Sequence, residues 1–472
     1  MTQRIIINPV TRISGFLEIE VQVENNIVTE ARTKGFLFRG FEKMLLGRSP
    51  FDVVYFTERI CGICSTAHAT AAALVLEDAL GFTVSEQGKI LRDILHGCEF
   101  IQNHIRHFYQ YTTPDFVRLP DIRPLYPVEH SDFRLPDSIT TRIGQHYFES
   151  LEISRSAHEM LAVLGGKVPH NHGIFIGGIT TQPTTDKIIK IKSLLQKINQ
   201  FIVDKMMPDV YSIAEYYKDY FSIGKGYGNL LSYGIFNNYK SLGTLYVDPL
   251  VYFSDGRTEG FNPVNITEEI DYSWFSGGKN TYKPFENGNI TDNMNKAGAY
   301  TWIKAARYKN LPFETGPLAR QWLSGEYRHG ISTMDRTVAR ALEAKKAAEV
   351  VGILLDNVVP GISLQSKYDV PDSAQGSGLV DTTRGSLGHW LKLENKVVSF
   401  YQIITPSVWN LSPHDNEGLN GVAEQALIGT TIKDTENPLE LGRIIRSFDP
   451  CVSCATHVYC EGREIKCIEV NP

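Results

Sequence analysis

Two Cys-x-x-Cys pairs stand at opposite ends of the 472-residue chain, and each is followed by a histidine at a short offset. The cysteines are Cys61, Cys64, Cys451 and Cys454, and the histidines are His68 and His457. Thiolates are soft ligands that suit nickel, copper, zinc and iron, and four of them can hold one metal or bridge two. Because the pairs are so far apart in sequence, the fold rather than a local loop must assemble any shared site.

This spacing leaves three kinds of chemistry open. A structural zinc site, a redox-active dithiol and a catalytic metal centre all use Cys-x-x-Cys pairs. A structural zinc site usually takes both pairs from a short stretch of chain, since its purpose is to stabilise a small domain. The wide separation therefore favours the catalytic metal centre over the other two.

The composition is that of a globular protein with a substantial core. Hydrophobic residues make up 42% of the chain and charged residues 21%. Its seven cysteines are an odd, sparse set and a poor disulfide framework. A formal net charge of −6 indicates no general affinity for nucleic acid or for an anionic membrane. The N-terminus opens in a strand-like run without a secretory signal, and no stretch is apolar enough to span a bilayer, so we expect membrane association only through a partner.

Helices are expected to position the first cysteine pair. The Ala-rich run 60–80 predicts a helix that carries Cys64 and His68 on one face. A long helix is predicted over 85–111, with Cys98 on its apolar face, which indicates core packing. Other predicted helices span 186–205, 334–355, 418–428 and 439–448.

Hairpins are predicted near both ends of the chain. The first covers 17–29 and turns at Asn25-Asn26, and the second covers 391–405 and turns at Glu394-Asn395. The region 220–300, rich in Gly, Asn, Tyr and Phe, is typical of short strands and loops that elaborate a larger domain. We therefore expect an α+β fold, with a predominantly helical core between N-terminal and C-terminal β-hairpins, forming one domain over 1–457.

Motifs around the cysteines resemble those of nickel–iron hydrogenase large subunits. The pattern Arg-x-Cys-Gly-x-Cys-x-x-x-His begins at Arg59, and Asp-Pro-Cys-x-x-Cys-x-x-His begins at Asp449. Further segments fit the family in its order: 8–12, 38–42, 165–170, 384–390 and 406–410. The region 220–300 matches least. This resemblance implies the large-subunit fold and a catalytic subunit that converts dihydrogen reversibly to protons and electrons.

The resemblance also implies a set of metal ligands. Cys61 and Cys451 would be terminal nickel ligands, and Cys64 and Cys454 would bridge nickel to an iron that carries carbonyl and cyanide. A magnesium or similar ion would bind nearby. Its implied ligands are Glu42, the backbone carbonyl of Ile403 and His457.

Other residues gain roles from the same resemblance. Cys451 would be the base that takes the proton, because metal binding keeps a thiolate deprotonated. Arg384 would lie over the open coordination position and donate to a cyanide, with Asp449 as its partner. The Ser407 hydroxyl, or a nearby backbone amide, would serve the second cyanide. His68 would lie near the ligands without being one.

The sequence departs from the family's common pattern at three polar positions. Ser14 stands where many members have a glutamate that first accepts the proton from the terminal thiolate. A serine hydroxyl does not ionise near neutral pH, so our hypothesis is that Ser14 and an ordered water pass the proton on, or that the exit route moves. Two other carboxylates could bear on the exit route: Glu18, which is close to Ser14 in sequence, and Glu58, which is close to Cys61. Asn103 and Thr383 replace a frequent aspartate and proline near the active-site arginine, which bears on oxygen tolerance and catalytic bias.

Partners follow from the resemblance as well. This chain has no spare cysteine cluster for iron–sulfur centres, so an iron–sulfur small subunit must take the electrons, in a heterodimer. Nickel-insertion proteins and a maturation endopeptidase are implied, and the latter would remove 458–472 to leave His457 at the C-terminus. Alternatives are a hydrogen sensor with low turnover, a metal-free respiratory-complex subunit and a structural zinc protein. The compartment stays open between the cytoplasm and export with a small subunit.

Overall fold

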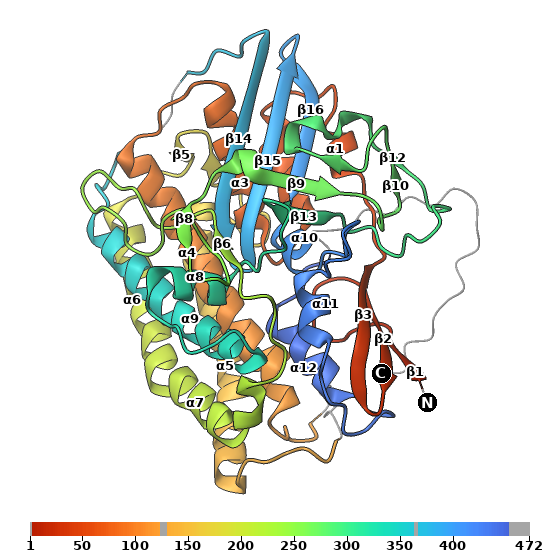
Figure 1. Ribbon diagram of the computed structural model, residues 1–472. Helices are drawn as coiled ribbons and strands as arrows, with labels where there is room; N and C mark the ends of the chain where they lie inside the picture. The colour runs from red at the N-terminus through yellow and green to blue at the C-terminus, as the bar shows by residue number, and fades with distance from the viewer. Residues whose placement is uncertain (1, 123–129, 363–366, 453–472) are drawn as a thin grey trace.

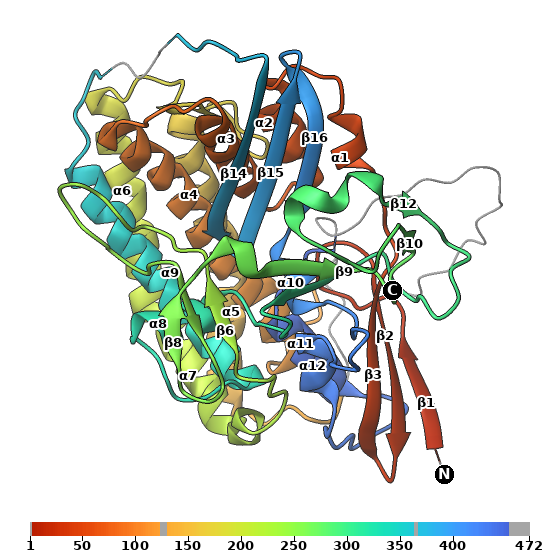
Figure 2. The same ribbon diagram turned by 45° about the horizontal axis from the view of Figure 1, so that its top comes forward.

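Figure 1 shows the computed structural model, which describes residues 2–122, 130–362 and 367–452. Long helices gather on one side, and antiparallel sheets lie on the other (Figures 1 and 2). This arrangement is the predicted α+β fold with a helical core. Within the described ranges, no helix combines the length and apolar character needed to cross a membrane.

The helical side is built from α4 and the helices around it. The bounds are α4 Glu86–Arg106, α5 Asp137–Gly165, α6 Thr185–Phe201, α7 Met207–Tyr216 and α9 Thr333–Asp356. The predicted helices 85–111, 186–205 and 334–355 are therefore confirmed, and helix α5 was not predicted. Capping side chains fix two starts: Ser85 accepts from the Gly88 N–H at 3.0 Å, and Ser332 and Asp335 form a capping box on α9.

The helix after the first cysteine pair begins later than predicted. Helix α3 spans Ser65–Ala79, whereas a 3₁₀ turn covers Glu58–Ile60 and Cys61 is extended, with φ −147° and ψ 132°. The prediction of a helix from Ile60 is wrong because the Cys-Gly-Ile-Cys segment is not helical. Its extended start at Cys61 lets the sulfurs of Cys61 and Cys64 face the same site. Cys64 is the N-cap residue, not a residue inside the helix.

Helix α3 packs on a three-stranded antiparallel sheet. Its strands are β14 Ser373–Thr382, β15 Gly385–Glu394 and β16 Val397–Ile404, in the order β14-β15-β16. The helix approaches β14 so closely that a Cβ on Gly378 would lie 2.2 Å from the carbonyl oxygen of Ala71. The predicted hairpin is confirmed, but its turn residues are Asn395 and Lys396, with φ 52° and 63°, not Glu394-Asn395. The left-handed backbone at both positions sets the turn one residue later.

The N-terminal hairpin gains a third strand. The strands β1 Thr2–Ile7, β2 Leu17–Glu24 and β3 Ile27–Gly35 pair in that order, and Asn25 and Asn26 form the predicted turn. The acidic side chains of β2, Glu18 and Glu20, are also buried. Both pair with Lys34, whose Nζ lies 2.8 Å from the Glu18 carboxylate.

The remaining elements are short. Within 220–310 the strands are β6 Leu230–Ser232, β7 Leu250–Tyr252, β8 Thr258–Gly260, β9 Ile266–Glu269, β10 Phe275–Ser276, β11 Thr281–Tyr282, β12 Thr291–Asp292 and β13 Ala305–Tyr308. The short helices are α1 Phe41–Met44, α2 Asp52–Thr57, α8 Pro317–Ser324, α10 Pro406–Asn410, α11 Val422–Leu427 and α12 Leu439–Ser447, and a small hairpin joins β4 Ile174–Phe175 to β5 Gly178–Ile179. The short strands of 220–300 and the helices near 418–428 and 439–448 match their predictions.

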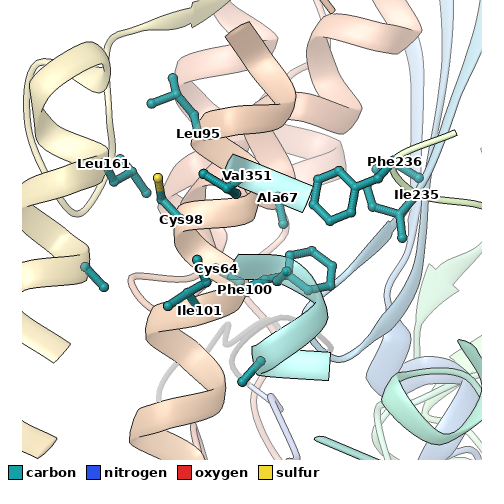
Figure 3. Close-up of a cluster of buried hydrophobic side chains, with 14 of the residues drawn as sticks. Cys64, Ala67, Leu95, Cys98, Phe100, Ile101, Leu161, Ile235, Phe236 and Val351 are labelled. Carbon is teal, nitrogen blue, oxygen red and sulfur yellow. The ribbon is translucent and has the colours of Figure 1, made fainter. Parts of the chain in front are cut away.

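Cys98 lies in the core, as predicted. Figure 3 shows it on α4 with Leu95, Ile101 and Leu161 around it, and its side chain is fully buried. Burial raises the pKa of the Cys98 thiol, which keeps it protonated and inert.

Candidate metal centre

Cys61, Cys64 and Cys451 converge in the interior. Their sulfur atoms lie within 4.8 Å of one another, and the Cys61 and Cys451 sulfurs are 3.3 Å apart. All three side chains are buried. The fold thus brings three of the four predicted ligand cysteines together from both ends of the chain. The two other predicted ligands from the second motif, Cys454 and His457, lie outside the described residues.

A short backbone bridge holds Cys451 against the N-terminal segment. The Ser14 N–H donates to the Pro450 carbonyl at 3.1 Å, and the Val452 N–H donates to the Ser14 carbonyl at 2.8 Å. The Cys451 N–H donates to the Ser407 hydroxyl oxygen at 3.0 Å. The structure therefore places both predicted residues, Ser14 and Ser407, beside Cys451.

Arg384 lines a cavity together with the cysteines. The cavity wall includes Cys64, Ala67, His68, Leu387, Ser407 and Cys451. The Arg384 Nε donates to the Asp449 carbonyl at 3.0 Å, and its Nη2 lies 3.1 Å from the Asp449 Oδ1. Its Nη1 has no hydrogen-bond partner within the described part of the chain. A buried guanidinium with a donor to spare fits an anionic acceptor such as cyanide.

Asp449 is ionised by the guanidinium groups around it. Burial alone would raise the pKa of its carboxyl, but Arg384, His107 and Arg340 outweigh burial and hold the pKa well below its usual range. The Arg340 Nη1 lies 3.2 Å from the Asp449 Oδ2. Asp449 also has a left-handed backbone, with φ 54°, immediately before Pro450 and Cys451.

Asn103 joins the same network as an amide. Its carbonyl oxygen accepts from Arg384 at 3.1 Å and from Arg106 at 2.6 Å, while its NH₂ group donates to the Asp449 Oδ2 at 2.9 Å. An amide satisfies all three contacts because it is both donor and acceptor. The sequence analysis identified Asn103 but missed Arg340. Arg340 lies on α9, far from Asp449 in sequence, and no motif marks it.

His68 stands behind the cysteines in a chain of buried aromatic groups. Its Nδ1 is 3.2 Å from the His389 Nε2, and the His389 Nδ1 is 2.8 Å from the Tyr401 hydroxyl. Burial lowers the pKa of His68 to about 4, so the ring is neutral at physiological pH.

The predicted magnesium ligands Glu42 and Ile403 lie together. The Ile403 N–H donates to the Glu42 Oε1 at 2.9 Å, which joins α1 to β16. Neither of the two carboxylates named in the sequence analysis is shown in contact with Ser14 within the described ranges, and Glu18 belongs to the ion pair with Lys34. Glu58 is fully buried and its Oε1 has no partner among the described residues.

Comparison with known proteins decides the family. A profile of the nickel-dependent hydrogenases matches residues 39–125, 122–330 and 323–457. The chain belongs to the nickel-dependent hydrogenase family. It is 36% identical over 488 residues to the periplasmic [NiFeSe] hydrogenase large subunit of Desulfomicrobium baculatum, covering 96% of this chain and 95% of that protein. It is 27% identical over 568 residues to the Hydrogenase-2 large chain of Escherichia coli K12, covering all of both.

Solved hydrogenase structures share the fold. The H2-activated [NiFeSe]-hydrogenase of Dm. baculatum superposes with a TM-score of 0.93 at 35% identity, covering 97% of this chain and 100% of that one. The reduced Ni-Fe-Se hydrogenase of D. vulgaris Hildenborough gives 0.92 at 38% identity, with the same coverage. The predicted family and fold are confirmed. This hydrogenase large subunit is the catalytic subunit of an oxidoreductase that acts on hydrogen, and the zinc-protein and respiratory-subunit alternatives are set aside.

Proposed function

We propose that this hydrogenase large subunit splits dihydrogen at a nickel–iron pair held by Cys61, Cys64, Cys451 and Cys454. The convergence of three buried sulfur atoms is the observation that carries this proposal. By the family resemblance, Cys61 and Cys451 would hold the nickel, and Cys64 and Cys454 would serve both nickel and iron, with thiolates that suit these soft metals. Several relatives are named for selenium as well. All four positions are cysteine in this chain, so the site proposed here is nickel–iron.

The side chains around the cavity suit a heterolytic split. When bound, the metals would supply the Lewis-acid and redox chemistry that the split needs and would keep the thiolates ionised. The Cys451 thiolate is the base for the proton. Arg384, fixed by Asp449, directs a positive charge and a spare N–H donor at the cavity, where it can bind one cyanide of an iron that also carries carbonyl. The Ser407 hydroxyl, which lines the same cavity, would donate to the second cyanide.

A magnesium or similar divalent ion is proposed at the edge of the same site. Glu42 supplies a carboxylate, Ile403 a backbone carbonyl and His457 an imidazole. The hydrogen bond that already joins Glu42 to Ile403 supports this grouping. Oxygen ligands are those that magnesium prefers.

The electrons require a partner. Apart from the four ligand cysteines, the sequence has only Cys98, Cys460 and Cys467, too few for a chain of clusters. We propose an iron–sulfur small subunit as acceptor, nickel-insertion proteins, and an endopeptidase that removes 458–472. One relative is named as periplasmic, which favours export with the small subunit. Any membrane association then comes through a partner.

An infrared spectrum of the purified complex tests the proposal. Bands of iron-bound carbonyl and cyanide are expected in a window where protein and water absorb little. Intact-mass measurement should show a chain that ends at His457. Processed protein that lacks these bands, or that holds zinc instead, would overturn the nickel–iron site. A full-length mass in active protein would overturn the cleavage.

A further inference from the structure

Arg340 is a buried guanidinium in contact with Asp449. It lies on α9 and only 3% of its surface is exposed. Its Nη1 donates to the Asp449 Oδ2 at 3.2 Å, and it lies 3.5 Å from the carbonyl oxygen of Thr383, the residue before Arg384. Arg340 therefore contacts both the carboxylate that pairs with Arg384 and the chain segment from which Arg384 projects.

The two oxygens of the Asp449 carboxylate have different surroundings. Its Oδ2 accepts two hydrogen bonds, from the Arg340 Nη1 at 3.2 Å and from the Asn103 NH₂ group at 2.9 Å. Its Oδ1 lies 3.1 Å from the Arg384 Nη2 as an ion pair, but accepts no hydrogen bond from any residue that the structure describes. Rotation about the last side-chain bond of an aspartate is only weakly restricted by the bond itself, so its hydrogen bonds decide the direction. Arg340 and Asn103 therefore set the direction in which Oδ1 faces Arg384.

A continuous series of contacts joins Arg340 to the metal centre. Arg340 binds one oxygen of the Asp449 carboxylate, and the other oxygen pairs with Arg384. Arg384 lines the cavity that Cys64 and Cys451 also line, and its Nη1 has no hydrogen-bond partner among the described residues. A change at Arg340 can thus reach the cavity through two side chains whose contacts are all described.

Arg340 is charged as well as buried. Burial lowers the pKa of Arg340 to about 10, while the negative charge of Asp449 opposes the fall, so the guanidinium is protonated at neutral pH. The other carboxylate nearby, Glu343, is already paired with Arg320 through a contact of 2.6 Å. The contact between Arg340 and Asp449 is therefore a charge-assisted hydrogen bond, which holds a carboxylate more firmly than a neutral donor does.

We propose that Arg340 is a positioning residue of this hydrogenase: it orients the Asp449 carboxylate so that Arg384 presents its free N–H donor to the cavity. The inference rests on the proposed function. Arg340 acts through Asp449 and Arg384, and it is not itself a catalytic residue. Its loss should disturb the groups around the metals without removing any residue that would hold them.

The test compares Arg340→Gln and Arg340→Lys with Arg92→Gln in the complete heterodimer. Gln retains an N–H donor but lacks the charge and the reach of the guanidinium, whereas Lys keeps the charge. Arg92 is a matched control, because it is also 3% exposed and forms an ion pair with a buried carboxylate, 2.7 Å from Glu77. Glu77 lies near the end of α3, about 20 Å along the helix axis from Cys64.

Arg340→Gln should retain the carbonyl and cyanide bands in the infrared spectrum, but with the cyanide bands shifted in the direction that Arg384→Lys shifts them. Hydrogen oxidation should fall about 10-fold, the lower end of what the loss of a supporting hydrogen bond around a metal site costs. Arg340→Lys should lie closer to the parent in both measurements, because its charge still meets the Asp449 carboxylate. Arg92→Gln should lower the free energy of unfolding and leave the bands where the parent has them.

A double-mutant cycle tests whether Arg340 acts through Asp449. If it does, adding Arg340→Gln to Asp449→Asn should shift the cyanide bands by less than the sum of the two separate shifts. Additive shifts would show that Arg340 influences the site by another route.

Four results would overturn the positioning role. They are parent-like bands and turnover in Arg340→Gln, an equally large band shift in Arg92→Gln, additive shifts in the cycle, and loss of the bands in both Arg340 variants. The last result would show that Arg340 is needed for folding or metal uptake instead. Each of them leaves the proposed function intact if the parent shows the bands. A parent without the bands would overturn the proposed function and the positioning role together.

Discussion

The two cysteine-bearing segments reach the same site by different means. Cys64 is the N-cap residue of α3, a helix buried between α4 and the sheet. The Glu99 carboxylate, on α4, accepts hydrogen bonds from two backbone amides in the first turn of α3. Cys451 follows a left-handed Asp449 and is held by a few hydrogen bonds to Ser14 and Ser407. The Cys61–Cys64 half of the site is held by packing in the core. The Cys451 half is held by a network of hydrogen bonds. Substitutions in the two halves should therefore fail in different ways.

The largest effect is expected from losing a sulfur. Cys64→Ser and Cys451→Ser should each abolish hydrogen oxidation, because a neutral hydroxyl is a poor ligand for nickel and iron. Metal analysis and the infrared bands measure the loss. Circular dichroism should show that both variants keep the parent's helix content. Retention of nickel and of the bands in either variant would contradict its role as a ligand.

Arg384→Lys tests the overlying half without removing its charge. Lysine cannot reproduce the contacts to the Asp449 carbonyl and carboxylate while also offering a spare donor to the cavity. Turnover should fall about 100-fold or more, and the cyanide bands should shift. The measurements are steady-state oxidation rates and infrared spectra. Unshifted bands with normal turnover would show that Arg384 does not face the iron ligands.

Asp449→Asn should separate stability from chemistry. Removing the carboxylate leaves Arg384 and Arg340 buried without their counter-charge, which costs about 3–5 kcal/mol in the free energy of unfolding. The pKa of Asp449 is lowered in the folded state, so its contribution is present above the ordinary aspartate range near pH 4 and is lost as pH falls below it. The deficit of the variant should therefore shrink on acidification. Denaturant titrations at several pH values check this, and a pH-independent deficit would contradict it.

The smallest effect is expected from Asn103→Asp. The new carboxylate still accepts from Arg384 and Arg106 but meets the Asp449 carboxylate where the amide donated at 2.9 Å. Two carboxylates so close raise one pKa of the pair. Turnover should change only a few-fold, with a new titration in the pH profile. An unchanged profile would show that the pair is separated by relaxation.

Most of the fold could be predicted where the sequence carries a strong local signal. Ser85 and Ser332 mark the starts of α4 and α9, and Asn25-Asn26 marks a turn. Helix α5 was missed because Gly144, Ser150 and Ser156 share its buried face with the apolar residues and weaken the periodic pattern.

The site was predictable only where cysteine chemistry identifies it. Glu99 and Arg340 lie on helices whose patterns look like ordinary packing, and their partners Thr66 and Asp449 are far away in sequence. Long-range contacts of this kind come from the tertiary arrangement. The spacing of Cys61 and Cys64 indicates a metal site. It does not indicate that the Glu99 carboxylate binds the first turn of the helix that follows.

The bridge between Ser14 and the Cys451 segment has a consequence for the timing of biosynthesis. Ser14 leaves the ribosome early, and its backbone partners Pro450 and Val452 are among the last residues to be made. A chain that stops before Cys451 lacks this bridge and two of the four cysteines proposed as metal ligands, so it cannot form the proposed site. The proposed metal centre therefore depends on a chain that has been made through its second cysteine motif.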